Sequence, residues 1–103
     1  MFIQRIHLYP AAGKEPELRT ALEEWTKKRQ AQGVMVSLTV QAFSAGGPAF
    51  AKTTKFRDLT EMENRRRQDQ ADPVFQAAVA KFASLSRAPV RSELYEVLVP
   101  YKS

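Results

Sequence analysis

The chain has 103 residues, of which 44% are hydrophobic and 26% are charged, and its formal net charge is +5 at pH 7. This length fits a single domain over residues 1–103, and the share of apolar residues excludes a disordered chain. Cysteine is absent and His7 is the only histidine, which excludes disulfides, thiolate nucleophiles and a metal site built from several histidines of one chain.

The first residues do not form a targeting signal. Residues 1–5, Met-Phe-Ile-Gln-Arg, lack a basic region followed by a long apolar stretch, so we expect no secretory signal. No apolar run approaches the roughly 20 residues that a membrane-spanning helix requires. We therefore expect a cytoplasmic protein that has no membrane partner.

Alternation and helical spacing predict three elements in the first part of the chain. Residues 2–9 alternate as a strand does, and Pro16 suits the first turn of a helix that continues to about Gln32, before Gly33. Residues 34–43 form the clearest strand, because every second residue is apolar. The apolar stripe of the helix consists of Leu18, Ala21, Leu22 and Trp25.

Four further elements are predicted, which are a turn over residues 44–48, a strand over 49–56, a helix in two segments from 58 to about 86, and a strand over 90–99. Asp58 followed by Glu61 is a capping box, which marks the start of the first helical segment. Asp72 and Pro73 are a second start signal, so we expect the helix to be broken there.

The predicted order is β-α-β-β-α-β, which is the order of a ferredoxin-like α+β fold. In this fold both helices cover one face of a four-stranded antiparallel sheet, and the other face stays open. The predicted apolar residues on the open face are Met35, Phe43, Tyr95, Val97 and Val99. A monomer rarely exposes such a patch, so we expect a homodimer in which a second copy covers the open sheet face.

RNA-recognition modules have the same element order, and a basic chain would suit a nucleic-acid partner. Those modules carry a basic residue, a glycine and aromatic residues within the third strand. Residues 49–56, Ala-Phe-Ala-Lys-Thr-Thr-Lys-Phe, contain no glycine, so we expect no nucleic-acid partner.

Several segments resemble those of small dimeric α/β-barrel proteins. Residues 9–14, Tyr-Pro-Ala-Ala-Gly-Lys, followed by Glu17 and a helix, are similar to the opening of NIPSNAP-like and antibiotic-biosynthesis-monooxygenase-like families. Residues 56–61, Phe-Arg-Asp-Leu-Thr-Glu, the arginines at 65–67, and residues 71–76, Ala-Asp-Pro-Val-Phe-Gln, resemble a pattern of NIPSNAP-like domains. The resemblance covers nearly the whole chain.

This resemblance implies a homodimer whose two sheets face each other as an eight-stranded barrel, with the helices outside. In monooxygenase-like relatives, a pocket between sheet and helices accepts an aromatic or quinone-like substrate and oxygen without metal or flavin. A cofactor-independent monooxygenase acting on an aromatic or other small organic molecule is therefore the first candidate function, with no cofactor expected. The alternative is a non-catalytic NIPSNAP-like binding or interaction homodimer.

Five residues are candidates for the site. His7 is the candidate catalytic residue, as a general base or proton shuttle, although a strand histidine can equally line an interface. Tyr9 and Tyr95 could orient an oxygenated aromatic ligand through their hydroxyls, or pack at an interface. Trp25 either lines the pocket or belongs to the core, and Arg67 either binds an oxyanion or lies in solvent.

Overall fold

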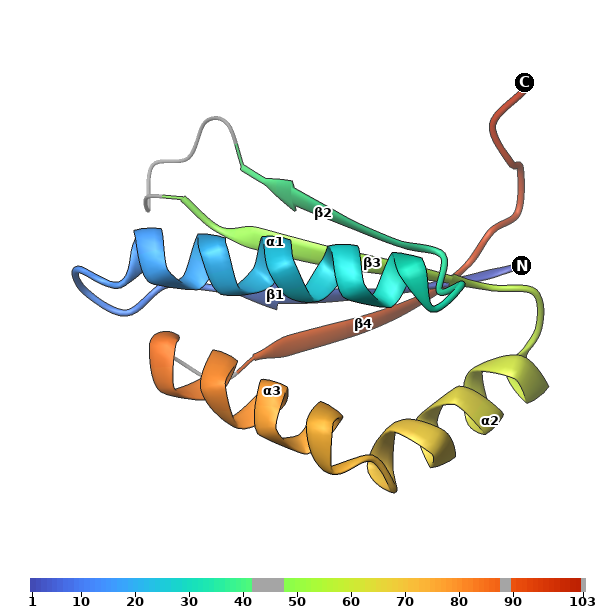
Figure 1. Cartoon of the computed structure of the whole chain (residues 1–103). Helices are drawn as coiled ribbons and strands as arrows, with labels where there is room; N and C mark the ends of the chain where they lie inside the picture. The colour runs from blue at the N-terminus through green and yellow to red at the C-terminus, as the bar shows by residue number, and fades with distance from the viewer. Residues whose placement is uncertain (42–47, 88–89, 103) are drawn as a thin grey trace.

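The computed structural model describes residues 1–41, 48–87 and 90–102. Within these residues, four antiparallel strands form one sheet in the order β2-β3-β1-β4, and three helices lie on one side of it (Figure 1). The elements are β1 (Phe2–Leu8), α1 (Glu15–Ala31), β2 (Val36–Val40), β3 (Phe50–Phe56), α2 (Leu59–Gln70), α3 (Pro73–Leu85) and β4 (Arg91–Glu96). The predicted ferredoxin-like α+β fold is confirmed.

No helix among the residues that the structure describes is long and apolar enough to cross a bilayer.

Capping residues set the boundaries of the helices. The Asp58 carboxylate accepts a hydrogen bond of 2.8 Å from the backbone N–H of Glu61, and the Asp72 carboxylate accepts one of 2.9 Å from that of Val74. The two caps start α2 and α3, which confirms the predicted break between them. Gly33 has a φ of 86°, a conformation that costs glycine little, and it turns the chain from α1 towards β2.

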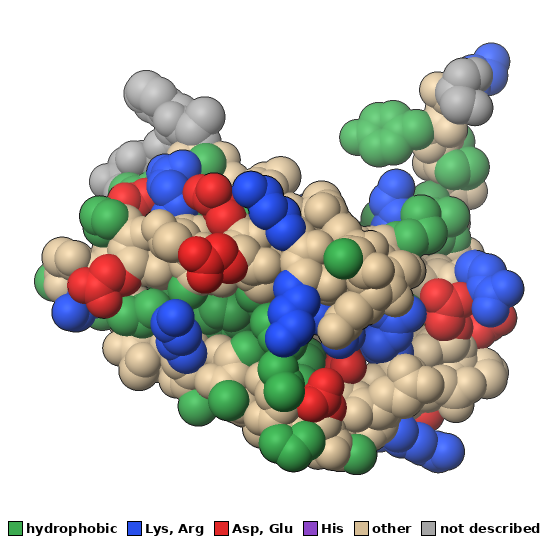
Figure 2. All heavy atoms as spheres, viewed as in Figure 1, with side chains coloured by type: hydrophobic (Ala, Val, Ile, Leu, Met, Phe, Trp, Pro, Cys, Tyr) green, Lys and Arg blue, Asp and Glu red, His purple; other side chains and the backbone are tan. Residues whose placement is uncertain are grey.

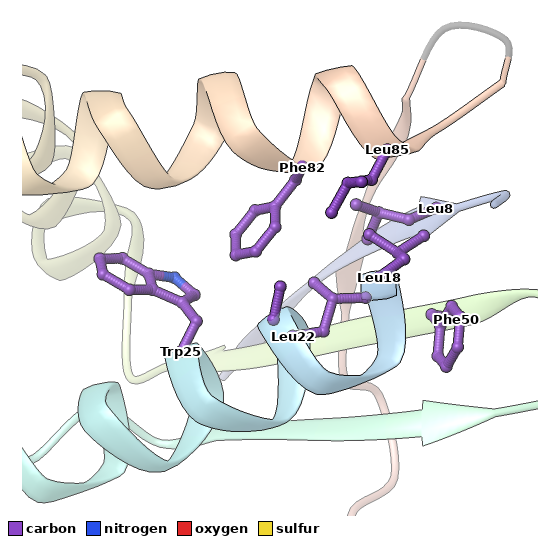
Figure 3. Close-up of a cluster of buried hydrophobic side chains, with 8 residues drawn as sticks. Leu8, Leu18, Leu22, Trp25, Phe50, Phe82 and Leu85 are labelled. Atoms are coloured by element: carbon purple, nitrogen blue, oxygen red, sulfur yellow. The ribbon is translucent and has the colours of Figure 1, made fainter. Parts of the chain in front are cut away.

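The hydrophobic core lies between the sheet and helices α1 and α3 (Figure 3). The Trp25 ring packs on Phe75 and Phe82, with centroid separations of 6.0 and 6.4 Å and tilted or edge-on geometry. Such arrangements are favourable for aromatic pairs and add to the burial of their surfaces. The core cluster consists of Leu8, Leu18, Ala21, Leu22, Trp25, Phe50, Phe82 and Leu85.

Two strands are shorter than the alternation predicts. β2 begins at Val36, because the backbone N–H of Val34 bonds the carbonyl oxygen of Arg29 at 3.1 Å and holds residue 34 in the turn after α1. The predicted strand residues 42 and 43, and most of the predicted turn over 44–48, lie outside the described residues. β4 ends at Glu96, and one further hydrogen bond of 2.9 Å joins the N–H of Val97 to the carbonyl oxygen of Met1.

The sheet face opposite the helices, here called the open face, is largely polar. Its described residues are Ile3, Arg5, His7, Ser37, Thr39, Ala51, Thr53, Lys55, Arg91, Glu93 and Tyr95. The predicted apolar patch is therefore observed only in part, and Met35 is exposed beside this face. Tyr95 lies on this face, but Val97 and Val99 follow the end of β4, Met35 precedes β2, and Phe43 lies outside the described residues.

Candidate functional site

A cavity of about 270 Å³ lies between the helix side of the sheet and helices α1 and α2. Its apolar lining consists of Ile6, Val34, Val36, Phe56, Met62 and Phe75. Its polar lining consists of Gln4, Arg29, Lys52, Thr54, Arg65, Arg66, Asp69 and Gln70. The volume is close to the lower end of the range for small-molecule sites, and an apolar wall with converging polar groups is typical of them.

The composition of α2 explains why this space is not filled. None of the residues Leu59–Gln70 is buried, and Met62 is the one apolar side chain of α2 that lines the cavity. Helix α1, in contrast, buries several apolar side chains against the sheet. A helix dominated by charged residues contributes little side-chain volume to the interior, so a cavity remains beneath it.

β3 places two polar side chains on its helix-facing side, where the alternating pattern of the strand predicts apolar ones. Lys52 and Thr54 point to the helix side, between the buried Phe50 and Phe56 on the same face of the strand. Ile6 of β1 lies opposite Lys52 in the sheet. The register thus places a lysine beside an aliphatic side chain at the base of the cavity.

An ion pair joins the two helices that border the cavity. Arg29 of α1 donates hydrogen bonds of 2.9 and 3.0 Å from its Nη2 to both carboxylate oxygens of Asp69 in α2. The two side chains are only 12% and 15% exposed, so solvent screens the pair less than a surface pair. The Arg29 guanidinium also lies over the Trp25 and Phe75 rings, at 5.7 and 5.6 Å from their centroids. These contacts hold Arg29 in place at the edge of the cavity.

Lys52 and Arg65 bring positive charge into the cavity, and the one carboxylate that the described residues place in its lining, that of Asp69, is already paired with Arg29. Burial, and secondly the positive charge of Arg29, lower the pKa of Lys52 below its ordinary value, while Asp69 acts in the opposite direction. Within the described residues, the Lys52 side chain makes no hydrogen bond or ion pair, and the buried Nη1 of Arg65 has no hydrogen-bond partner. Figure 2 shows basic side chains gathered where α1 approaches α2.

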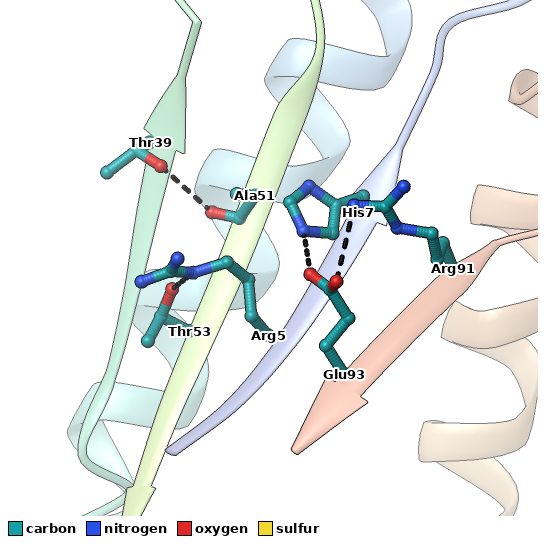
Figure 4. Close-up of polar contacts among 7 residues, drawn as sticks. All are labelled: Arg5, His7, Thr39, Ala51, Thr53, Arg91 and Glu93. Atoms are coloured by element: carbon teal, nitrogen blue, oxygen red, sulfur yellow. Dashed lines mark hydrogen bonds and ion pairs between the residues drawn. The ribbon is translucent and has the colours of Figure 1, made fainter. Parts of the chain in front are cut away.

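The predicted catalytic residue His7 lies on the open face, on the opposite side of the sheet from the cavity (Figure 4). Its Nε2 is 2.7 Å from Oε1 of Glu93, which also pairs with Arg91 at 3.3 Å. A hydrogen bond from Tyr95 and a second one with His7 lower the pKa of the Glu93 carboxyl. The Arg5 guanidinium lies 5.7 Å from the centroid of the Tyr95 ring. Among the described residues, no cluster of three or more His, Cys, Asp or Glu could hold a metal ion.

The other three predicted site residues lie apart from both places. Tyr9 follows β1, and the Arg87 guanidinium stands 5.5 Å from the centroid of its ring. Trp25 is buried in the core, where its ring packs against that of Phe75, a residue that lines the cavity. Arg67 is 73% exposed and pairs with Glu63 at 3.4 Å. The structure therefore joins His7 and Tyr95 in one cluster but brings none of the five predicted residues into the cavity lining.

Sequence reasoning missed Arg29, Lys52 and Asp69 as cavity residues. It considered the arginines at 65–67 as oxyanion ligands but preferred Arg67, whereas Arg65 and Arg66 are the two that line the cavity. One signal was present in the sequence. Lys52 lies an even number of residues from Phe50 and Phe56, so it falls on the same face of the strand as these two buried residues. The ion pair between α1 and α2 left no comparable signal, since its partners are 40 residues apart in the chain.

No family model matches the sequence, and no curated protein matches it significantly. Solved structures match over nearly the whole chain at low sequence identity. A structure named as an antibiotic biosynthesis monooxygenase is 15% identical, with a TM-score of 0.74 over 97% of this chain and 100% of the other. A Deinococcus radiodurans structure that is provisionally assigned to the same group is 21% identical, with a TM-score of 0.70 over 100% and 98% of the two chains.

A further similar structure is an uncharacterised NIPSNAP domain protein from Burkholderia xenovorans. It is 19% identical, with a TM-score of 0.71 over 98% of this chain and 95% of the other. At these identities the likeness concerns the fold. The chain therefore has the fold that solved antibiotic biosynthesis monooxygenase and NIPSNAP structures share.

Proposed function

We propose that the cavity between the sheet and helices α1 and α2 binds a small organic molecule, and that the protein is a cofactor-independent, monooxygenase-like oxidoreductase. The observation that carries the proposal is the cavity of about 270 Å³, in which an apolar wall faces converging polar groups. Its position between sheet and helices matches the place that the family resemblance implies for a substrate. Structures of the same fold that are named as monooxygenases support the oxidoreductase assignment.

A reaction of this class balances without an external reductant. Oxidation of an activated methylene group to a carbonyl by one O₂ forms one carbonyl oxygen and one water, and the substrate supplies all the electrons. Such a reaction begins with transfer of a proton from the methylene group to solvent, which leaves a negative charge on the substrate. The two methylene hydrogens are finally balanced by the water that is formed. Lys52 and Arg65 would stabilise that charge, because preorganised cations at a developing anion lower the barrier.

The proposal is tested with anthrone, an aromatic ketone that has an activated methylene group. We expect protein-dependent oxygen uptake, with one anthraquinone formed for each O₂ consumed, as measured with an oxygen electrode and by product absorbance. If the reaction occurs in the cavity, Lys52→Met lowers the rate by about tenfold or more. A loss of about 100-fold in His7→Ala, with an unchanged rate in Lys52→Met, would instead place the chemistry on the open face.

The second candidate function is a non-catalytic NIPSNAP-like binding homodimer. It is favoured by the location of His7, which is paired with Glu93 on the open face rather than facing the cavity. A protein that binds small aromatic molecules in the cavity but shows no uptake of oxygen with anthrone would support this function. In both candidates the second copy is proposed to cover the open face.

A further inference from the structure

We propose that the molecule bound in the cavity is an organic acid, whose carboxylate or comparable anionic group contacts Lys52 and Arg65. This inference rests on the proposed function, because it assigns a ligand class to the same cavity. The inference adds that the ligand carries a negative charge. An uncharged aromatic ligand would agree with the proposed function but contradict the inference.

The first step is the balance of charge in the cavity lining. Four basic side chains and one carboxylate line the cavity in the described part of the chain. Asp69 is already paired with Arg29 through two hydrogen bonds, and Arg66 pairs at 2.6 Å with Glu63 outside the cavity. The positive charges that remain in the lining belong to Lys52 and to Arg65, whose charge also acts on the Glu61 carboxylate outside the cavity lining.

The second step concerns what these two cations lack. The Nη1 atom of Arg65 is buried and has no hydrogen-bond partner among the described residues, and the Lys52 ammonium group makes neither a hydrogen bond nor an ion pair there. A buried donor without an acceptor is costly, and a buried charge is more so. Burial also lowers the pKa of Lys52, which is the expected response of an uncompensated ammonium group. An anionic ligand would supply the missing acceptor to both groups.

The third step separates an organic acid from an inorganic anion. The apolar lining, which includes Ile6, Val36, Met62 and Phe75, would gain nothing from an inorganic anion that interacts only with the basic groups. A ligand with an apolar body of roughly one or two rings would fill a cavity of about 270 Å³ and cover this wall. The combined lining therefore fits a small amphiphilic acid.

The experiment compares two probes of nearly equal shape by isothermal titration calorimetry. 2-Naphthoate carries a carboxylate, whereas 2-naphthalenemethanol carries a neutral hydroxymethyl group on the same ring system. The titrations use a Tris chloride buffer, so that no phosphate or sulfonate competes for the cations. We expect the full-length protein to bind 2-naphthoate at least tenfold more tightly than 2-naphthalenemethanol.

Variants of the two cations identify the contact. Lys52→Met and Arg65→Met should each weaken binding of 2-naphthoate by about tenfold or more while leaving binding of 2-naphthalenemethanol within about twofold. Lys55→Met is the matched control, because Lys55 lies on the same strand, faces the open side and is exposed. It should leave the affinity for both probes unchanged.

Three other results would overturn the inference, and they show whether the proposed function fails with it. Equal affinity of the wild-type protein for both probes would remove the preference for an acid but leave the proposed small-molecule cavity intact. Failure of both probes to bind would contradict the proposed function as well. Equal losses of both probes in Lys52→Met and Arg65→Met would show that these side chains shape the cavity rather than contact an anion.

Discussion

At the scale of single residues, Lys52 differs most from what its position favours. It occupies the helix-facing side of β3, where Phe50 and Phe56 at the two ends of the strand are buried. Removing an ammonium group from water is unfavourable, and no carboxylate pairs with Lys52 among the described residues. The lysine therefore lowers the stability of the ligand-free protein, which is typical of groups whose role lies in binding.

Replacing this lysine by a side chain of similar length should stabilise the ligand-free protein. We expect Lys52→Met to raise the free energy of unfolding by about 1 kcal/mol, which corresponds to a rise in Tm of about 4–8 °C for a domain of this size. Thermal unfolding followed by circular dichroism measures the change. Lys55→Met, on the exposed side of the same strand, should shift the Tm little. A lower Tm in Lys52→Met would show that the lysine has a stabilising partner.

The lowered pKa of Lys52 predicts how ligand binding depends on pH. Burial and the nearby Arg29 shift this pKa below 10.5, against the opposite effect of Asp69. Because the protonated lysine binds the anion, the affinity for 2-naphthoate should be constant at pH values well above about 4 but below the lowered pKa of Lys52, and fall as the pH rises through that pKa. The naphthoate carboxylate stays ionised over this range, since the pKa of a carboxylic acid is about 4.

The control for this pH profile is the Lys52→Met variant. Besides Lys52, the charged side chains that line the cavity are Arg29, Arg65, Arg66 and Asp69, and this variant retains all four. The variant should therefore bind 2-naphthoate weakly, with an affinity that does not change between pH 7 and 10. The same decline in both proteins would assign the titration to another group.

At the scale of elements, α2 decides where the protein can bind a ligand. It buries none of its residues, and the Arg29–Asp69 ion pair joins it to α1. Helices α1 and α3 instead pack together through apolar side chains around Trp25. The interior is consequently filled beneath α1 and α3 and left partly empty beneath α2.

The ion pair between α1 and α2 should matter more than the ion pairs on the surface. Asp69→Asn leaves Arg29 without a counterion, so we expect the free energy of unfolding in urea to fall by about 2 kcal/mol. Glu63→Gln removes an exposed partner of Arg66 and Arg67 and should cost about 0.5 kcal/mol or less. Equal effects of the two substitutions would mean that solvent screens both pairs alike.

The sequence predicts the elements well where local residues determine them. The caps at Asp58 and Asp72 and the glycine at 33 act over a few residues, so the starts of α2 and α3 and the end of α1 follow from the pattern. The end of β4 cannot be predicted from the local sequence, because it depends on how far the neighbouring strand β1 extends beside it. The cavity depends on which helix lies over Lys52, and only the tertiary packing of α2 determines that.

At the scale of the whole molecule, the open face is suited to a dimer contact that includes polar groups, whereas the residues predicted from the sequence suggested an apolar contact. His7, Glu93, Tyr95 and Arg5 form a polar cluster there, and Ile3 and the exposed Met35 lie on or beside the same face. Self-association through this face would rest on hydrogen bonds and charge pairs as well as on apolar contact. Such an interface can be stable, since protein interfaces commonly combine both.

Sedimentation velocity at micromolar concentration tests the proposed homodimer. We expect a species of twice the 11.7 kDa mass of the chain. The substitution Glu93→Gln removes the carboxylate that pairs with His7 and Arg91, and it should shift the equilibrium towards monomer if the cluster lies in the interface. A strict monomer in the wild-type protein would contradict the dimer.

The central claim is that the ligand site lies on the helix side of the sheet, and methyl NMR titration with 2-naphthoate tests it most directly. Ile6 and Met62 line the cavity, whereas Ile3 lies on the open face and Met35 is exposed next to it. The two isoleucines lie on the same strand, so each pair of like residues serves as an internal control. The account predicts saturable shifts of the Ile6 and Met62 methyl signals with little change at Ile3 and Met35, and the reverse pattern would contradict it.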